Sequence, residues 1–186
     1  MTGLKRLIFA TGKPGIGKTS VLLRTVDALK SKNYRTGGMI SREVREGGLR
    51  VGFEILDVCT GQRGWLAHVN QSTGPKISKY RVNLMDLDAI GAASIRNAME
   101  SDDIIVVDEI GPMELSSPAF RAAVLAAVES RKPLLGTIHY GLSDQLINRV
   151  RAREDAEILE VTHDNRVNLH KTIVEKVISF VRSSQT

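Results

Sequence analysis

Short apolar runs and longer amphipathic segments alternate along the chain. Apolar runs predict strands at residues 6–10, 38–44, 49–58, 104–107, 134–138 and 158–161. Apolar positions spaced three and four apart predict helices at residues 18–30, 84–99, 118–131, 143–150 and 169–181. Residues 104–107 are apolar throughout, which is typical of a strand covered on both faces. The alternation predicts an α/β fold: a mostly parallel central sheet with helices on both faces, arranged in three layers.

One segment departs from this alternation. Two strand-like runs within residues 38–58 flank Glu46, Gly47 and Gly48, and apolar and polar residues alternate along the second run. This pattern around a Gly-Gly turn predicts an antiparallel β-hairpin added to the parallel sheet. Residues 60–79 then read as a loop-rich stretch. Because no linker divides the chain, we expect residues 1–186 to form a single domain.

The turn between the first strand and the first helix carries a phosphate-binding pattern. Its eight residues fit G-x-x-x-x-G-K-[ST]: Gly12, Lys13, Pro14, Gly15, Ile16, Gly17, Lys18 and Thr19. Between a strand and a helix start, such a loop points backbone N–H groups at an anion, which the helix N-terminus also favours. Lys18 can then reach the β- and γ-phosphates of a nucleotide, and the Thr19 hydroxyl can hold Mg²⁺. The pattern predicts a P-loop nucleotide site.

A metal partner for this loop follows the apolar run at residues 104–107. Asp108 and Glu109 stand at its end, and ligands bind outside the carboxyl ends of parallel strands. In P-loop enzymes an Asp at this place holds Mg²⁺ together with the loop Ser or Thr. We therefore predict Thr19 and Asp108 as the metal-binding pair. A neighbouring carboxylate can orient and deprotonate an attacking water, which predicts Glu109 as the general base.

No specific sequence motif identifies the side chains that would sense or stabilise the γ-phosphate, but several are candidates. Thr137 and His139 end the strand at residues 134–138, and they would point toward the γ-phosphate if this strand lies between the two strands of the site. A capping hydroxyl and an exposed imidazole are the alternative. The candidates for a charge-stabilising arginine finger are Arg42, Arg149, Arg153 and Arg166, each of which could instead be a solvated surface residue.

Composition restricts the class of protein. An apolar content of 42% and a charged content of 25% are ordinary for a globular domain, and no apolar run approaches the ~20 residues of a membrane span. The start of the chain does not resemble a signal peptide, and the lone Cys59 excludes an internal disulfide. We expect a cytoplasmic monomer without membrane contact, and a packed rather than reactive Cys59 thiol.

Charge bears on the partners. The net charge is +5, which steers anions such as nucleoside triphosphates toward the chain. The same excess could serve nucleic acid, but the basic residues are scattered and lack interleaved aromatic residues. Nucleic acid is therefore possible as a partner but not favoured.

These motifs together resemble a known family, the small P-loop nucleoside-triphosphatases related to the human cancer-related nucleoside-triphosphatase, of which archaea and thermophilic bacteria carry similar proteins. The resemblance covers nearly the whole chain and rests on residues 11–19, 41–45, 52–53, 79–82, 108–115 and 137–139. The most specific part is the tail Gly111-Pro112-Met113-Glu114-Leu115 after the two acids. Ser78 stands where the family often has glycine, which puts that turn in question.

The resemblance implies an activity. It implies a Mg²⁺-dependent hydrolase of ATP, GTP and other nucleoside triphosphates, with broad base preference, and Glu109 as the catalytic base. Two alternatives stay open. One is a nucleotide, nucleoside or RNA-end kinase, which would pass the γ-phosphate to an acceptor instead of water. The other is a nucleotide-dependent, RNA-associated switch.

Overall fold

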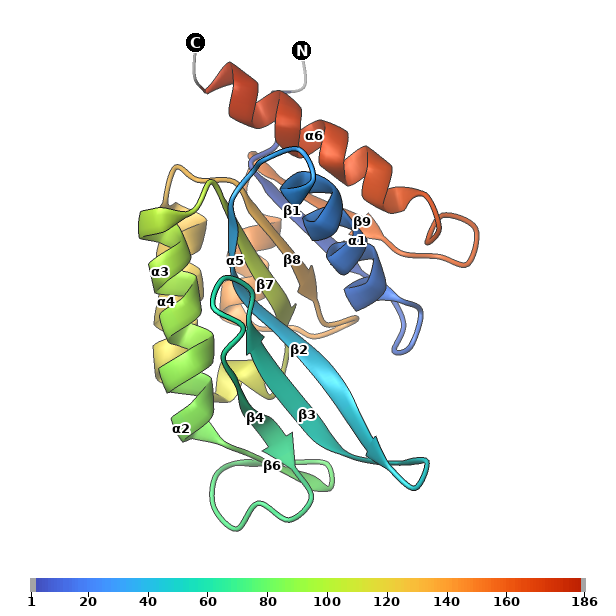
Figure 1. Cartoon of the computed structure of the whole chain (residues 1–186), viewed down its shortest axis with the longest axis vertical. Helices are drawn as coiled ribbons and strands as arrows, with labels where there is room; N and C mark the ends of the chain where they lie inside the picture. Colours follow the sequence, from blue (N-terminus) through green and yellow to red (C-terminus); the bar gives the residue numbers. More distant parts are fainter. Residues whose placement is uncertain (1–2, 185–186) are drawn as a thin grey trace.

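One nine-stranded sheet organises the protein, for which the computed structural model describes residues 3–184 (Figure 1). The strand order is β5-β6-β4-β3-β2-β7-β8-β1-β9. The strands are β1 (Leu7–Thr11), β2 (Thr36–Glu46), β3 (Leu49–Asp57), β4 (Arg63–His68), β5 (Lys76–Ile77), β6 (Tyr80–Val82), β7 (Ile104–Ile110), β8 (Leu134–Ile138) and β9 (Ala156–Glu160). The helices are α1 (Lys18–Lys30), α2 (Leu84–Asp86), α3 (Ala93–Ser101), α4 (Pro118–Glu129), α5 (Gln145–Arg151) and α6 (Leu169–Ser183).

Strands β2, β7, β8, β1 and β9 form the parallel part of the sheet. Strand β8 lies between β1 and β7, so the strand that leads into the phosphate loop is separated from the carboxylate strand by one neighbour. β7 runs to Ile110, three residues beyond the predicted end at residue 107. Asp108 and Glu109 therefore lie within the carboxyl end of the strand. Asp108 pairs with Ile40 of β2, whereas the register towards β8 shifts between Val107 and Ile110.

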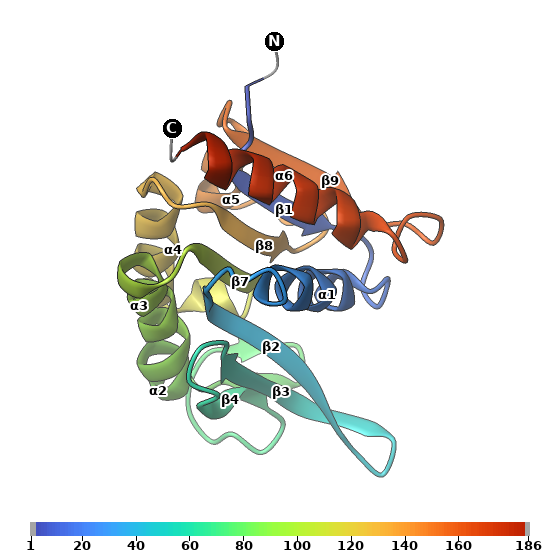
Figure 2. The same ribbon diagram turned by 45° about the horizontal axis from the view of Figure 1, so that its top comes forward.

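Helices cover both faces of the parallel part, as the sequence predicts (Figures 1 and 2). α1 and α6 pack together on one face over a core that includes Ile8, Val106 and Leu135. α3, α4 and α5 cover the other face, whose core includes Phe9, Val107 and Phe120. Alternate residues of β7 thus enter opposite cores, and for this reason the run from Ile104 to Val107 is apolar at every position.

The predicted hairpin is present as β2 and β3, joined at Gly47 and Gly48, and it projects beyond the rest of the sheet in Figure 2. The loop-rich interpretation of residues 60–79 was incomplete, because β4 and β5 lie there and extend the sheet with β6 in antiparallel pairs. These strands are short, and their pattern alternates too little to stand out. Ser78, in the turn from β5 to β6, adopts a left-handed backbone with φ 58°.

The helix predicted at residues 84–99 is one continuous helical stretch with an irregular middle. A π-helical segment, Leu87–Ala92, joins α2 to α3. Within this segment, Asp88 accepts a hydrogen bond of 2.5 Å from the hydroxyl of Ser117. Ser117 also caps α4, whose first residue is Pro118, by accepting from Phe120 N at 3.0 Å.

Two smaller expectations have different outcomes. Cys59 is exposed rather than packed, because the chain leaves the sheet at Asp57, whose Oδ1 accepts from Cys59 N at 2.8 Å.

Within residues 3–184, every helix is too short or too polar to cross a lipid bilayer.

Candidate active site

The loop between β1 and α1 has the backbone geometry that suits an anion. Gly17 precedes α1 with φ 110°, a left-handed conformation that glycine adopts without strain. No side chain caps this helix start, and the first turn carries no acidic residue. The first N–H groups of α1 therefore remain available to an anion, which the helix dipole also favours.

Two threonines from different elements converge on Asp108. Thr19 Oγ1 donates a hydrogen bond of 2.9 Å to Asp108 Oδ2, and Thr137 Oγ1 donates one of 2.5 Å to Oδ1. Asp108 is 1% exposed, and this burial raises its pKa to about 6, while the two hydroxyl donors act in the opposite direction. The contact between Thr19 and Asp108 brings the predicted pair together at the carboxyl edge of the sheet.

This pair fits a magnesium ion. A hydroxyl and a carboxylate supply only oxygen, which Mg²⁺ prefers, and Mg²⁺ commonly takes one or two protein ligands beside phosphate and water oxygens. The fit rests on the direct Thr19–Asp108 contact, because two groups 2.9 Å apart can share one ion.

Lys18 and Glu109 form the second contact between the loop and β7. Lys18 Nζ lies 3.5 Å from Glu109 Oε2 and donates to the Gly12 carbonyl at 3.2 Å. Both side chains are largely buried, so the ion pair is less screened than one on the surface. The predicted base and the predicted phosphate-binding lysine thus face the same space.

That space is a cavity of about 710 Å³. The phosphate loop and the strand ends form one wall, with Pro14, Gly15, Gly17, Lys18, Thr19, Asp108, Glu109 and His139. The hairpin and its neighbouring strands contribute Ser41, Arg42, Glu43, Arg50, Phe53, Leu66 and Ile77, and the turn after β7 contributes Met113. A hollow of about 470 Å³ between α1 and α6 includes none of the motif residues, so we place the site in the larger cavity.

Both candidate sensors lie at this cavity or next to it. Thr137 is fully buried and binds Asp108, so it orients the carboxylate from behind. His139 lines the cavity, and its Nδ1 is buried without a hydrogen-bond partner among the described residues. A buried imidazole nitrogen without a partner costs free energy unless a ligand or water satisfies it.

The four candidate arginines are far apart. Arg149 pairs with Glu129 at 3.0 Å, and Arg153 pairs with Asp155 at 2.7 Å, directly before β9. These two lie at the amino edge of the parallel strands, opposite the phosphate loop, so the structure does not support either as a finger within the chain.

Arg166 and Arg42 have different positions. Arg166 follows β9 and does not line the cavity; its carbonyl accepts a long hydrogen bond of 3.5 Å from Arg24. Arg42, on β2, is the one candidate that lines the cavity. Its guanidinium has no ion pair with any residue in the described part of the chain.

Glu114 also lines the cavity, although the motifs in the sequence did not predict it as a site residue. It follows β7 in a short 3₁₀ segment, Glu114–Ser116, is 5% exposed and lines the cavity. Its position in the family-specific tail was the available signal, because an acid within an otherwise apolar stretch needs a reason to be buried.

Comparison with known proteins agrees with this geometry. A family model described as NTPase matches residues 7–174. The nucleoside-triphosphatase THEP1 of Thermofilum pendens is 43% identical over 172 residues, covering 92% of this chain and 94% of that protein. The THEP1 of Thermotoga maritima is 36% identical over 178 residues, covering 96% and 98%.

Solved structures agree with the fold. The solution structure of a human cancer-related nucleoside triphosphatase aligns with a TM-score of 0.80 and 34% identity, covering 94% of this chain and 98% of that one. The crystal structure of THEP1 from Aquifex aeolicus aligns with a TM-score of 0.79 and 25% identity, covering 92% and 98%. With its phosphate loop, paired carboxylates and nearly full-length matches, the chain belongs to the THEP1 family of P-loop nucleoside-triphosphatases.

Proposed function

We propose that the chain is a Mg²⁺-dependent nucleoside-triphosphatase that converts ATP, GTP and other nucleoside triphosphates to the diphosphate and phosphate. The observation that carries this proposal is the pair of contacts between the loop and β7: Thr19 with Asp108, and Lys18 with Glu109. The names of the relatives support the same reaction class.

Each residue has a defined part in the proposed reaction. Loop N–H groups from residues 12–19 and the Lys18 ammonium bind the β- and γ-phosphates. Thr19 and Asp108 would hold Mg²⁺, which supplies positive charge to the phosphate oxygens. Glu109 accepts a proton from water as the water oxygen bonds to the γ-phosphorus and the bond to the β-phosphate oxygen breaks. Arg42 and His139, which line the cavity, would stabilise the charge of the transferred group.

Broad base preference is part of the proposal. The residues assigned above bind phosphates or act on water, and none of them recognises a base edge. A site of this kind discriminates weakly among nucleotides because the binding energy comes from the shared triphosphate.

Phosphate release from eight nucleoside and deoxynucleoside triphosphates, with Mg²⁺ and with a chelator, tests the activity. We expect turnover of all eight within about tenfold of one another and loss of turnover with the chelator. If Glu109→Ala hydrolysed ATP at the rate of the unmutated enzyme, Glu109 would not be the base.

A phosphotransferase is the second candidate, favoured by the extent of the cavity. Beyond the residues assigned to the phosphates and the water, the apolar side chains of Phe53, Leu66 and Ile77 also line the cavity. An acceptor hydroxyl placed there would face the γ-phosphate in place of water. Labelled γ-phosphate added to nucleosides, nucleoside monophosphates or RNA ends, compared with free phosphate release, distinguishes transfer from hydrolysis.

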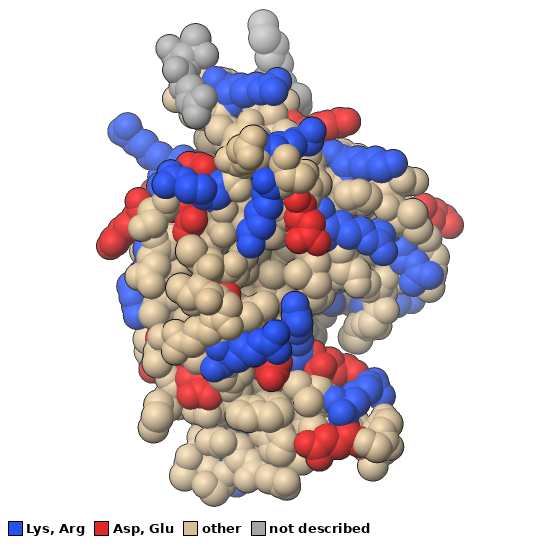
Figure 3. Space-filling model, viewed as in Figure 1, with Lys and Arg blue, Asp and Glu red and all other residues tan. Residues whose placement is uncertain are grey.

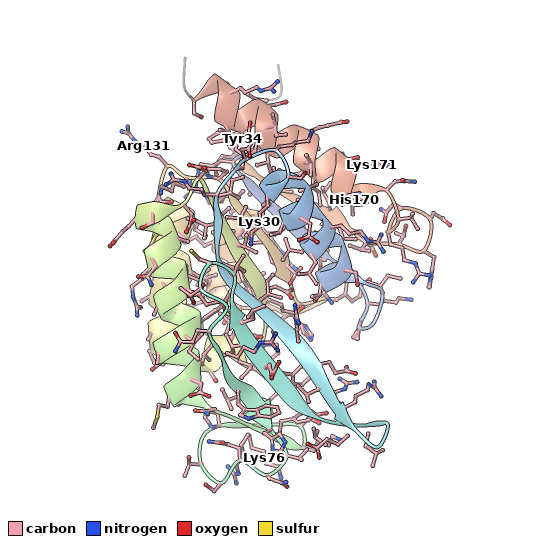
Figure 4. The ribbon with its side chains drawn as sticks, viewed as in Figure 1. Lys30, Tyr34, Lys76, Arg131, His170 and Lys171 are labelled. Carbon is pink, nitrogen blue, oxygen red and sulfur yellow. The ribbon has the colours of Figure 1, made fainter. Side chains whose placement is uncertain are left out.

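An RNA-associated switch has less support. On the face shown in Figure 3, basic residues are interspersed with acidic ones and form no continuous strip. Figure 4 shows Lys30, Lys76, Arg131 and Lys171 on separate parts of the fold. We therefore propose a cytoplasmic monomer acting on small nucleotides; the exposed thiol of Cys59 suits a reducing compartment.

A further inference from the structure

Glu114 is a buried carboxyl group that the proposed reaction does not use. It is 5% exposed and forms no ion pair within residues 3–184. The charged groups that act on it most strongly are Glu109 and then Asp108, both acidic. Its burial therefore has no compensating positive charge, unlike most buried acids.

Gly111 brings Glu114 and Glu109 together. A Cβ atom built on Gly111 would lie 2.9 Å from Glu109 Oε1 and 3.0 Å from Glu114 Oε2. The two carboxyl groups thus converge on the space that the missing side chain leaves open. The other oxygen of Glu109, Oε2, faces Lys18 Nζ at 3.5 Å. The two oxygens of Glu109 therefore have different neighbours.

The surroundings of Glu114 favour its neutral form. An ionised carboxylate without a counter-charge is costly in a buried site, and a second carboxylate nearby adds repulsion. Burial, followed by the charge of Glu109, raises the pKa of Glu114 to about 8, although the backbone N–H groups of Glu114 and Gly111 act in the opposite direction. At neutral pH the side chain carries a proton that it can donate.

The segment that holds Glu114 is rigidly tied. Leu115 N donates to Gly111 O at 2.9 Å, and Ser117 N donates to Glu114 O at 3.1 Å. Arg121 Nε donates to Leu115 O at 2.6 Å, and the same guanidinium binds Asp144 at 2.7 Å, which anchors the turn to α4 and the start of α5. A donor on such a turn can fix the orientation of its partner.

We propose that Glu114, in its neutral form, is a positioning residue that donates a hydrogen bond to Glu109 and fixes its carboxylate for water activation. This inference rests on the proposed hydrolysis, in which Glu109 is the base. Glu114 holds Glu109 from the Oε1 side, so the carboxylate keeps its place when Lys18 turns from Oε2 to the phosphates. Oε2 is then free to receive the proton from water.

Glu114→Gln and Glu114→Leu form a matched pair of variants. The Gln amide donates a hydrogen bond as the neutral acid does, whereas Leu has a similar size and no donor. We expect Glu114→Gln to keep kcat for ATP within about twofold of the unmutated enzyme and Glu114→Leu to lower kcat at least about tenfold. KM is expected to stay within about twofold in both variants, because the proposed role of Glu114 is to orient Glu109 and not to bind the phosphates.

Two results in this assay would overturn the proposal: an unchanged kcat in Glu114→Leu, or an equal loss of kcat in the two variants. A purely structural role would lower the thermal midpoint of Glu114→Leu without the rescue of kcat by Gln. If Glu114→Leu does not fold, the proposal can still be tested by comparing Glu114→Gln with the unmutated enzyme. A loss of kcat of about tenfold or more in Glu114→Gln would contradict the proposed hydrogen-bond donor.

An infrared measurement tests the proton without using activity. The difference spectrum between the unmutated protein and Glu114→Gln at pH 7 is expected to show the carbonyl stretch of a neutral carboxyl group. Its absence would overturn the proposal. If the unmutated enzyme released no phosphate from Mg-ATP, the proposed function would fail while this band would still report on Glu114.

Discussion

Thr19 and Asp108, 89 residues apart along the chain, meet in a hydrogen bond of 2.9 Å between the phosphate loop and β7. This contact predicts the effect of replacing Asp108 by Asn. The amide keeps the shape of the carboxylate but loses the charge that we propose to bind Mg²⁺, so we expect kcat to fall at least about 100-fold. The fold is expected to persist, because the change removes a buried charge. Phosphate release and thermal unfolding measure the two effects.

Thr137→Val is the companion variant for this test. It removes the second hydroxyl donor to Asp108 and leaves Thr19 in place. We expect a smaller loss of kcat and a higher Mg²⁺ concentration for half-maximal rate, because the carboxylate is less well oriented. If the rate of the Asp108→Asn enzyme depended on Mg²⁺ concentration as that of the unmutated enzyme does, Asp108 would not be a metal ligand.

The ion pair between Lys18 and Glu109 predicts two different kinetic defects. Glu109→Gln is expected to lower kcat by about 100-fold or more while ATP still binds, because only the proton acceptor is lost. Lys18→Ala is expected to weaken ATP binding and abolish turnover, because Lys18 is the proposed phosphate-binding lysine. Equilibrium binding of a labelled ATP analogue separates the defects, with Lys32→Ala, on the exposed segment after α1, as the control. Equal ATP affinity in Lys18→Ala and the control would contradict this assignment.

The positions of the arginines predict which of them affects turnover. Arg42 lines the cavity, so Arg42→Ala is expected to lower kcat at least about tenfold. Arg153 binds Asp155 at the opposite edge of the sheet, so Arg153→Ala is expected to leave kcat within about twofold and to change stability by about 1 kcal/mol or less. The reverse order of effects would show that the finger comes from the region of α5.

The buried acid Glu114 predicts how stability depends on pH. Its pKa rises from 4.5 in the unfolded chain to about 8 in the folded protein. Between these values the unfolded state releases the proton first, so the free energy of unfolding falls as pH rises, by up to about 1.4 kcal/mol per pH unit. Below both pKa values the contribution is fully present, and above about pH 8 its loss is complete.

Glu114→Gln removes this titration. Urea unfolding of the two proteins between pH 5 and 8 is expected to show that the variant gains stability relative to the unmutated protein as pH rises. If the difference in the free energy of unfolding between the two proteins stayed constant from pH 5 to 8, the pKa of Glu114 in the folded protein would not be raised.

Local sequence patterns predicted much of the fold, and they nominated the candidate site residues that the fold brings close together. The apolar spacing located α1, α4 and α6 to within two residues, and the Gly-Gly turn located the hairpin. The phosphate loop could be recognised because its chemistry lies within eight consecutive residues, and Asp108 and Glu109 because an apolar strand directly precedes them. In each case, residues close together in the chain carry the signal.

Long-range placement required the tertiary structure. The order of β1, β8 and β7 brings Thr137 to Asp108, and the turn after β7 brings Glu114 to Glu109. The sequence could not distinguish Arg149 and Arg153 from Arg42 as finger candidates. In the fold, Arg42 lies at the cavity, whereas Arg149 and Arg153 lie at the opposite edge of the sheet.

The chain by itself thus determined most of the helices and strands and which residues are candidates for phosphate binding. The folded structure decided which of those residues meet and which acid is buried without a counter-charge. The reason is physical: helix and strand periods depend on near neighbours, whereas strand order and burial depend on the packing of the whole chain.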